Sequence, residues 1–317
     1  MELRKDYVLD RYVILATNRG KRPSQFKVED DSLSNLPELD ENCPFCPGNE
    51  DKTPEEKGRV EHNGTWKFRW FDNKFAAVDI NGDHIVRTDN EFFTFANAFG
   101  KHEVIVETPK HNKQLWDLDE HELSELISVY NFRLEELSRI PGIKYVCLFK
   151  NHGPKAGTSL IHSHSQIIAY NVVPFWVREL IKAVAKFEGC PFCRVIEREK
   201  NSDRRILETD NFLTFTPYAS QYPFEVLIFP KKHIRFLNDL REHFDELALH
   251  LRQILLKLKE LNCSYNIVWL NSTFDKDLHF HIRIIPRITT PGGFEFYGTH
   301  INVVAPEDAA HFYRGGV

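Results

Sequence analysis

Two copies of one cysteine-containing tetrapeptide occur in the chain. Residues 43–46 and 190–193 both read Cys-Pro-Phe-Cys. Two thiolates at this spacing can bind one metal ion from a tight turn, with further ligands supplied from elsewhere in the chain. A thioredoxin-type redox pair is the alternative, but such pairs lie in a βαβ unit and are rarely duplicated. The duplication therefore predicts two metal sites, and six cysteines in 317 residues are too few for a disulfide framework.

Histidines follow each cysteine pair in the same order. Each half contains a lysyl-histidine, at His111 or His233, and later a His-x-His segment that begins at His162 or His279. Two cysteines with two histidines favour zinc over magnesium or calcium, which prefer oxygen ligands. The predicted ligands are Cys43, Cys46, His111 and His162 for one zinc, and Cys190, Cys193, His233 and His279 for the other. Because each ion would have four protein ligands, we expect both sites to be structural.

The segment IHSHSQIIAY, residues 161–170, places further polar residues beside one metal histidine. Alternate side chains of an extended strand share a face, so His162, His164 and Gln166 are expected about 7 Å apart on one side. If His162 binds zinc, His164 remains free for chemistry next to a rigid anchor.

A glycine-containing loop, residues 151–160, precedes this strand and contains Gly153, Gly157 and Ser159. The backbone N–H groups of such a loop can contact an anion. A neutral imidazole beside a bound phosphate is a competent nucleophile at phosphorus. Gln166 can donate a hydrogen bond to a non-bridging oxygen as charge builds there. The combination suggests nucleotidyl or phosphoryl transfer through a phosphohistidine at His164.

The elements that must position these residues also occur twice. Residues 102–140 match residues 224–261: each segment has an apolar strand-like run, a lysyl-histidine, an acidic helix start and a helix with apolar residues three to four apart. A strand that carries His-x-His then follows in each half. This pattern predicts an α+β fold of two similar antiparallel-sheet units with packed helices, related by an internal pseudo-twofold axis. A helix over 175–187 is expected to link them.

Composition and charge exclude several classes of function. The chain is 42% hydrophobic with a net charge of −5, which gives no sign of a nucleic-acid or membrane partner. Apolar runs fall short of the ~20 residues that span a bilayer, and residues 1–15 lack the apolar region of a signal peptide. We therefore expect a cytoplasmic protein. Cys147 and Cys263 lie in apolar runs and are interpreted as core residues.

The segment GPKAGTSLIHSHSQ, residues 153–166, resembles the signature of galactose-1-phosphate uridylyltransferases, the transferase branch of the histidine triad superfamily. Segments similar to this family also occur in its order at 11–23, 69–78, 102–111 and 292–310. The resemblance implies histidine-triad-like sheet units: a catalytic half over 1–174, and a second half over 175–317 with the other zinc and a hexose-contacting tail. It also implies a homodimer.

The resemblance further implies a ping-pong reaction in which His164 is the nucleophile. His164 would take UMP from UDP-glucose and pass it to galactose 1-phosphate, while Gln166 and Ser159 hold the α-phosphate. The remaining substrate-binding residues implied are Arg19, Arg22, Asn151 and Gly157 near the phosphates, Phe71, Asn73, Phe75 and Val104 near the base and ribose, and Phe294 and Glu295 near the hexose.

Individual residues also have simpler interpretations. The two arginines can belong to a solvated basic turn, the aromatic residues to the core, and Glu295 to the surface. Ser163 stands where the family has a proline between the two histidines, which adds a donor without removing the nucleophile. In the second half His281 follows no glycine-serine loop and Arg283 replaces the glutamine, so His281 is interpreted as non-catalytic.

Three other functions remain open at this point. An ADP-glucose phosphorylase or related adenylyltransferase would use the same histidine with a different base and acceptor. A histidine triad hydrolase carries a third histidine where this chain has Gln166, and a glutamine cannot act as a general acid or base toward water. A zinc-stabilised binding module without catalysis would leave the loop and His164 unexplained.

Overall fold

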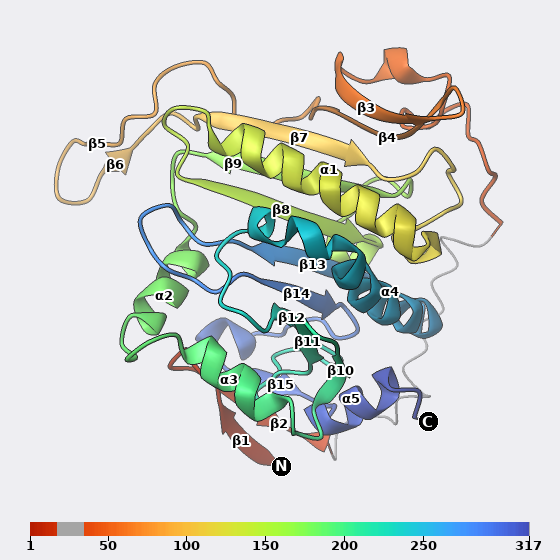
Figure 1. Cartoon of the computed structure of the whole chain (residues 1–317). Coiled ribbons are helices and arrows are strands. Elements are labelled where there is room, and N and C mark those ends of the chain that lie inside the picture. Colours follow the sequence, from red (N-terminus) through yellow and green to blue (C-terminus); the bar gives the residue numbers. More distant parts are fainter. Residues whose placement is uncertain (18–34, 317) are drawn as a thin grey trace.

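The strands of both halves join into a single sheet. The computed structural model describes residues 1–17 and 35–316, in which a ten-stranded sheet has the order β10-β11-β12-β14-β13-β8-β9-β7-β4-β3 (Figure 1). The first half contributes β3 (Glu56–His62), β4 (Thr65–Asp72), β7 (Gly100–Val106), β8 (Tyr145–His152) and β9 (His164–Tyr170). The second half contributes β10 (Arg205–Glu208), β11 (Phe212–Phe215), β12 (Val226–Pro230), β13 (Tyr265–Leu270) and β14 (His281–Pro286). The two predicted antiparallel units are confirmed, and they are fused edge to edge.

The strand order is symmetric about its centre, where β8 pairs antiparallel with β13. Read outward from this pair, β8, β9, β7, β4 and β3 correspond to β13, β14, β12, β11 and β10. Antiparallel pairing of two equivalent strands is the arrangement that a twofold axis through the sheet requires. The topology therefore agrees with the predicted internal repeat.

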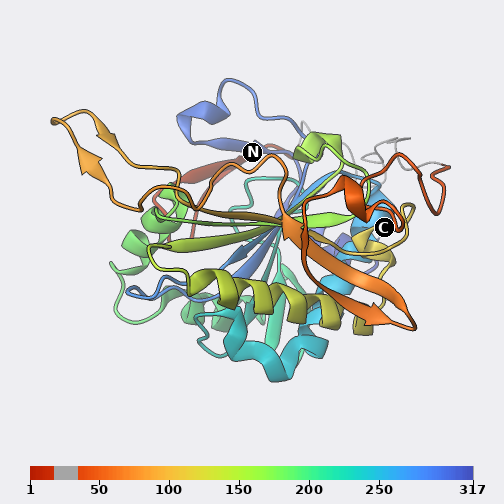
Figure 2. The ribbon, with the colours of Figure 1, turned by 90° about the horizontal axis from the view of Figure 1, so that it is seen from above.

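One helix of each half covers the same face of the sheet. Helices α1 (Glu120–Ser138) and α4 (Phe244–Leu261) contact each other on that side (Figure 2). α1 begins with a capping box, in which the side chains of Asp119 and Glu122 accept hydrogen bonds from each other's backbone N–H groups. The equivalent positions, 122 residues later, hold Arg241 and Phe244. That cap is absent there, and a 3-10 helix, η7 (Leu237–His243), leads into α4, which begins two residues after the position equivalent to the start of α1.

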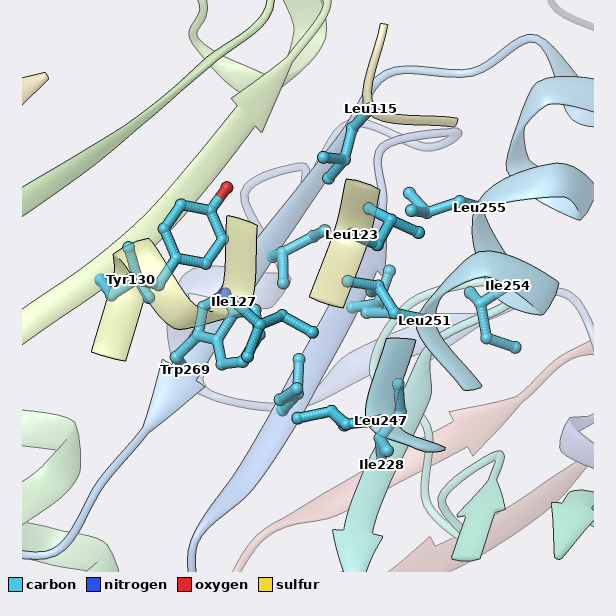
Figure 3. Packing of buried hydrophobic residues seen from close by; sticks show 14 of the residues in the cluster. Leu115, Leu123, Ile127, Tyr130, Ile228, Leu247, Leu251, Ile254, Leu255 and Trp269 are labelled. Carbon is cyan, nitrogen blue, oxygen red and sulfur yellow. The ribbon is translucent and has the colours of Figure 1, made fainter. Parts of the chain in front are cut away.

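The main hydrophobic core lies between these two helices and the sheet. Leu123 and Ile127 of α1 are buried together with Leu247 and Leu251 of α4 and Trp269 of β13 (Figure 3). The two residues of each helix are four positions apart, which matches the predicted helical pattern. Burying one such side chain contributes about 1.5–3 kcal/mol to stability. This core joins both halves into one unit.

The opposite face of the sheet differs between the halves. Over the second half it is covered by α2 (Phe175–Val184) and α3 (Pro191–Glu199), which share a second core with Phe215 and Phe229. α2 falls within the linking helix predicted at 175–187. Over the first half this face carries cavities instead. Cys263 is buried as predicted, whereas Cys147 is only half-buried and lines an apolar groove on the open face.

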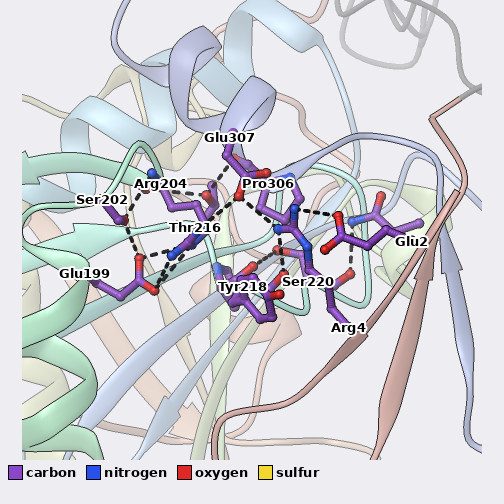
Figure 4. A network of polar contacts seen from close by, with 12 residues as sticks. Glu2, Arg4, Glu199, Ser202, Arg204, Thr216, Tyr218, Ser220, Pro306 and Glu307 are labelled. Carbon is purple, nitrogen blue, oxygen red and sulfur yellow. Dashed lines mark hydrogen bonds and ion pairs between the residues drawn. The ribbon is translucent and has the colours of Figure 1, made fainter.

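The two ends of the chain meet on the second half. β1 (Glu2–Lys5) and β2 (Tyr12–Leu15) form a small sheet with β15 (His300–Asn302), and α5 (Pro306–Tyr313) follows β15. Arg4 and Arg204 contact the same carboxylate oxygen of Glu307 at 2.9 and 2.8 Å, and Arg204 also pairs with Glu199 at 2.9 Å (Figure 4). This network ties β1 to α3 and α5.

A short hairpin, β5 (Arg87–Thr88) and β6 (Thr94–Phe95), projects away from the large sheet (Figures 1 and 2). Within the described residues, every helix is too short or too polar to cross a bilayer.

A buried ion pair supports β9 from the helix side of the sheet. Lys150 of β8 and Glu107, which follows β7, are 2% and 0% exposed, and Nζ lies 2.5 Å from Oε2. Ser163 and Ser165 donate to the same carboxylate, and Lys150 also donates to the backbone carbonyl of His164 at 3.1 Å. The serines and the histidines of this segment therefore point to opposite sides of the strand.

The ion pair is charged despite its burial. Burial by itself raises the pKa of Glu107, but the Lys150 ammonium and the donating hydroxyls hold that pKa below its ordinary value. Burial lowers the pKa of Lys150, and the Glu107 carboxylate opposes this shift. Each charge therefore depends on the other for its stability.

Removal of both partners should destabilise the protein by less than the sum of the two single removals. In Glu107→Gln or Lys150→Met the surviving charge is left buried and unpaired, and we expect the free energy of unfolding to fall by about 3–5 kcal/mol in each. The double variant should lose clearly less than the sum, because neither charge remains. Urea unfolding of the four proteins measures this difference. Strict additivity of the two single effects would contradict the coupling.

Candidate active site and metal centres

The four residues predicted as ligands of the first metal meet in a buried cluster. The ligand atoms of Cys43, Cys46, His111 and His162 all lie within 4.8 Å of one another. His162 Nδ1 is 3.6 Å from both sulfurs, and His111 Nδ1 is 3.6 Å from Cys46 Sγ. An ion with tetrahedral bonds of about 2.3 Å to sulfur and about 2.1 Å to nitrogen separates these atoms by about 3.6 Å. The donor set therefore fits a tetrahedral ion.

The second predicted ligand set forms an equivalent cluster that is less buried. Its ligand atoms, from Cys190, Cys193, His233 and His279, also lie within 4.8 Å of one another. His279 Nδ1 is 3.8 and 3.6 Å from the two sulfurs, and His233 Nδ1 is 3.6 Å from Cys193 Sγ. The outward nitrogen Nε2 of His233 lies 3.0 Å from an Asp277 carboxylate oxygen.

Hydrogen bonds from Nε2, the ring nitrogen that points away from each cluster, orient His162 and His279. His162 donates from Nε2 to the Thr108 carbonyl at 2.7 Å, and His279 donates from Nε2 to the Pro230 carbonyl at 2.9 Å. A carbonyl oxygen only accepts, so Nε2 carries the proton and Nδ1 offers its lone pair to the cluster. Burial lowers the pKa of His162 to about 4 and that of His279 to about 3, which keeps both rings neutral.

His164 is the first residue of β9, and its side chain lies on the same side of the chain as that of His162, two residues earlier. It is 7% exposed, and its Nδ1 donates to the His162 backbone carbonyl at 2.8 Å. The proton is therefore on Nδ1, and Nε2 carries a free lone pair. Burial lowers the pKa of His164, so the ring is neutral. Phe45, between the two cluster cysteines, holds its ring 5.3 Å from the imidazole in an edge arrangement.

Two cavities meet at His164. The larger is about 620 Å³ and the smaller about 250 Å³, and both are lined by Ser159, Leu160 and His164. Residues 151–154 and 158–160 of the glycine-containing loop line the smaller cavity. The predicted residues on the wall of the larger cavity are Phe71, Asn73, Phe75, Val104, Ser159, His164 and Gln166. Asn151 lines the smaller cavity, and its Oδ1 accepts from Asn266 at 2.8 Å.

The remaining predicted residues lie elsewhere. Gly157 adopts φ +84°, which favours glycine, at the end of the 3-10 helix η6 (Pro154–Ala156), outside both cavity walls. Phe294 and Glu295 lie at the start of η8 (Glu295–Tyr297), and the structure does not bring them to either cavity. Arg19 and Arg22 fall outside the described residues.

A histidine that sequence reasoning missed orients Gln166. His102 accepts a hydrogen bond at Nδ1 from the backbone N–H of Ala77, at 3.2 Å. Its proton must then be on Nε2, which donates to Gln166 Oε1 at 2.9 Å. The Asn73 amide donates to the same oxygen at 3.4 Å. With Oε1 occupied, the NH₂ group of Gln166 remains to donate into the cavity that it shares with His164.

The alternation of side chains on β7 could have revealed His102. Val104 was predicted at the site, and a residue two positions away on a strand shares its face. β7 pairs with β9 so that Val104 lies opposite Gln166. His102, two residues before Val104, therefore lies diagonally across from Gln166 on the same face. Lys52, the last residue of the 3-10 helix η4 (Glu50–Lys52), and Lys74 also line the larger cavity, but no sequence motif pointed to them.

The corresponding histidine of the second half is enclosed. His281 donates from Nδ1 to a carbonyl two residues earlier at 2.9 Å, as His164 does. However, Phe229 stacks on its ring at a centroid distance of 4.6 Å, and Phe192 lies 5.4 Å away. Val106 stands opposite His164 on the strand next to it, where the second half has Phe229. The larger side chain fills the space that is open in the first half.

The position of Gln166 is also altered in the second half. Arg283 stands there, and it donates to Glu225 at 2.7 Å and to Gln221 at 2.8 Å. Its guanidinium is therefore engaged in internal pairs. These contacts agree with the interpretation of His281 as non-catalytic.

Two family profiles match the chain. The profile described as "Galactose-1-phosphate uridyl transferase, N-terminal domain" matches residues 1–174, and that of the corresponding C-terminal domain matches residues 144–291.

Similar proteins extend over almost the whole chain. An ADP-glucose phosphorylase of Arabidopsis thaliana is 34% identical over 327 residues, which cover 99% of this chain and 92% of the relative. A galactose-1-phosphate uridylyltransferase of Thermotoga maritima is 28% identical, with coverage of 99% and 98%. The crystal structure of an A. thaliana ADP-glucose phosphorylase with bound ADP-glucose has a TM-score of 0.84 at 32% identity, covering 100% of this chain and 98% of that chain.

The two tautomers inferred at the site can be observed directly. In long-range proton–nitrogen spectra of protein with isotope-labelled histidine, we expect His164 to carry its proton on Nδ1 and His102 on Nε2. Spectra of His164→Ala and His102→Asn assign the two signals. A proton on Nδ1 of His102 would leave that ring unable to donate to Gln166 and would contradict the proposed orientation.

Proposed function

The chain belongs to the galactose-1-phosphate uridylyltransferase family, and on that premise we propose that it transfers a nucleoside monophosphate through a covalent nucleotidyl-histidine at His164. The observation that carries this proposal is the setting of His164. Its Nδ1 is tied to a carbonyl, and its free Nε2 lies where two cavities meet. An imidazole held in this tautomer is ready to attack phosphorus.

The first half-reaction uses a nucleotide sugar as donor. Nε2 of His164 attacks the α-phosphorus, an N–P bond forms, and the bond from that phosphorus to the bridging oxygen breaks. The sugar 1-phosphate leaves with the bridging oxygen, so no proton has to be supplied. The NH₂ group of Gln166 and the hydroxyl of Ser159, both on the cavity wall, donate to the non-bridging oxygens as charge builds on them.

The second half-reaction reverses this chemistry with a different acceptor. A phosphate oxygen of the acceptor attacks the phosphorus, and the N–P bond to His164 breaks. Gln166 cannot remove a proton from water, so hydrolysis of the intermediate is disfavoured. The two cavities at His164 provide space for the base and ribose on one side and for the loop-bound phosphates on the other.

The first candidate reaction transfers UMP from UDP-glucose to galactose 1-phosphate. Both matching family profiles and the T. maritima relative support it, since they are described as galactose-1-phosphate uridylyltransferases. In this reaction the wall formed by Phe71, Asn73, Phe75 and Val104 contacts uracil and ribose.

The second candidate is an ADP-glucose phosphorylase, which passes AMP to inorganic phosphate. It is supported by the 34% identity to the A. thaliana phosphorylase and by the similarity to its complex with ADP-glucose. Both candidates use His164 and Gln166 in the same way. They differ in the base that the larger cavity accepts and in the size of the acceptor.

We also propose zinc as the ion of both clusters. Two thiolates and two imidazoles match its preferred donors, and the sulfur–nitrogen separations of 3.6–3.8 Å match tetrahedral coordination. With four protein ligands neither ion has a position for substrate. The first zinc would hold His162 and thereby fix the start of β9 beside His164.

Exchange of label between a sugar phosphate and a nucleotide sugar tests the covalent mechanism. When labelled glucose 1-phosphate is mixed with UDP-glucose or ADP-glucose and no other acceptor, a nucleotidyl-enzyme returns the label into the nucleotide sugar. We expect His164→Ala to lower the exchange rate by at least ~10³-fold, since the nucleophile is gone. His121→Ala, on the exposed side of α1, is the matched control and should exchange normally.

The donor that supports exchange separates the two candidates. Exchange with UDP-glucose alone identifies the uridylyl reaction, and exchange with ADP-glucose alone identifies the phosphorylase. Turnover with either donor in the absence of any exchange would contradict a ping-pong mechanism.

Loss of each metal should have different consequences. We expect two zinc ions per chain by atomic spectroscopy, and one in either Cys43→Ser or Cys190→Ser. Cys43→Ser should also lower the exchange rate strongly, because its cluster holds β9 beside His164. Cys190→Ser acts on the enclosed half and should affect exchange far less. Equal losses of activity in the two variants would show that the first zinc has no special part in positioning His164.

A further inference from the structure

One residue of the second half contacts the glycine-containing loop beside His164. Asn266 of β13 stands opposite Asn151 of β8 in the central strand pair. Its Nδ2 lies 2.8 Å from Asn151 Oδ1 and 3.0 Å from the backbone carbonyl oxygen of Ala156. Asn151 lines the smaller cavity together with His164, and Ala156 lies in the loop between them. The side chain of Asn266 therefore connects the second half to the site in the first.

The contact with Ala156 fixes the orientation of both amides. A backbone carbonyl oxygen only accepts, so the atom of Asn266 that faces it is the nitrogen. The NH₂ group of Asn266 donates one hydrogen to Ala156 and the other to Asn151, which receives it at Oδ1. The NH₂ group of Asn151 is then the part of that amide left to donate, on a residue that lines the cavity at His164.

A second residue, just before β13, fixes the same loop. Ser264 Oγ accepts a hydrogen bond from the backbone N–H of Lys155 at 3.3 Å. A Cβ atom at Gly153 would lie 2.3 Å from this oxygen, and Gly153 has φ +78°, so the close approach requires glycine. Ser264 and Asn266 are two residues apart and share a face of the extended chain. The glycine-containing loop therefore rests on the second half.

The internal twofold axis can be located in the central strand pair. Phe149 of β8 stands opposite Val268 of β13. On their other sides Phe149 pairs with Gln166 and Val268 pairs with Arg283, which are equivalent residues of the two halves. Phe149 and Val268 are thus equivalent to each other, 119 residues apart, and the axis passes between them.

This axis relates the two asparagines to residues without amides. Asn151 and Asn266 stand opposite each other two residues from the axis, on the side of the glycine-containing loop. The equivalent positions on the other side hold Leu270 and Cys147. The strand pairing is therefore compatible with apolar side chains in this place. The architecture does not require the amide pair, which is present only on the side that carries the loop.

We propose that Asn266 is a positioning residue for the reaction, because it directs the NH₂ group of Asn151 toward the phosphates of the nucleotide sugar and holds the loop at Ala156. This inference rests on the proposed nucleotidyl transfer, which brings a phosphate chain to His164. Asn266 lies outside the walls that the described residues form around His164, so it acts through Asn151 and the loop. The second half thereby takes part in phosphate binding.

A double-mutant cycle between Asn266 and Asn151 tests the proposal. Asn266→Leu removes both donors at similar size, and the rate of label exchange should fall by about 10-fold. In a chain that carries Asn151→Ala the same substitution should lower the rate by less than about 3-fold, because the amide that Asn266 orients is gone. Cys147→Ser, at the equivalent position of β8, is the matched control and should exchange normally. Equal losses in both backgrounds would show a general structural effect and overturn the proposal.

A second substitution at the same position reverses the amide. Asn266→Asp keeps the side-chain shape but offers only acceptors, so Asn151 has to turn its NH₂ group toward the carboxylate and its oxygen toward the phosphates. The exchange rate should fall further than in Asn266→Leu. The Asn151→Ala background measures the effect of the added charge alone. The proposal requires the loss to be about 10-fold larger when Asn151 is present, and an equal loss in its absence contradicts it.

Binding measurements separate this proposal from the proposed reaction. The cycle of Asn266→Leu with Asn151→Ala is repeated in His164→Ala, where no transfer occurs, and calorimetry gives the dissociation constants of UDP-glucose and ADP-glucose. Asn266→Leu should weaken the tighter donor by about 10-fold only where Asn151 is present. Coupled binding without exchange by the wild-type chain would refute the covalent mechanism and leave the role of Asn266 intact.

The remaining outcomes are decisive against the role of Asn266. Thermal unfolding establishes that each variant is folded. The proposal is overturned if folded Asn266→Leu binds and exchanges as the wild-type chain does, if the two substitutions have additive effects on binding, or if neither nucleotide sugar binds.

Discussion

The alternation of side chains along β9 is the constraint on which the rest of the site depends. One face of the strand presents His162 to the metal cluster and His164 to the cavities, and the other face rests on the buried Lys150–Glu107 ion pair. A shift of one residue would turn the histidines toward the helix side of the sheet and the serines toward the cluster and the cavities. The cysteine–histidine cluster and the ion pair hold the strand from opposite sides, and together they leave His164 little freedom to move. Its hydrogen bond to the carbonyl of His162 then sets the tautomer.

The internal repeat gives two halves with one framework and different surroundings for the equivalent histidines. Both halves keep a cysteine–histidine cluster and a histidine that donates to a backbone carbonyl two residues earlier. In the first half the face above that histidine is open. In the second half Phe229 and helices α2 and α3 cover it. Differences between equivalent positions, such as Val106 against Phe229, account for this difference in access.

Features that depend on spacing along the chain could be predicted, and those that depend on pairing between distant segments could not. The two cysteine–histidine clusters and the α+β repeat follow from duplicated motifs and apolar periodicity. The fusion of two sheets into one depends on the pairing of β8 with β13, which no local pattern specifies. The role of His102 depends on the register between β7 and β9 and on a backbone N–H in a loop.

The most direct test of the account is the mass of the enzyme trapped after its first half-reaction. The chain is mixed with a nucleotide sugar, quenched under alkaline conditions that preserve an N–P bond, and analysed whole and as peptides. The account predicts a gain of one nucleoside monophosphate, located on His164 in the peptide that contains residues 161–170. An adduct on another residue, or active enzyme that forms no adduct, would contradict it.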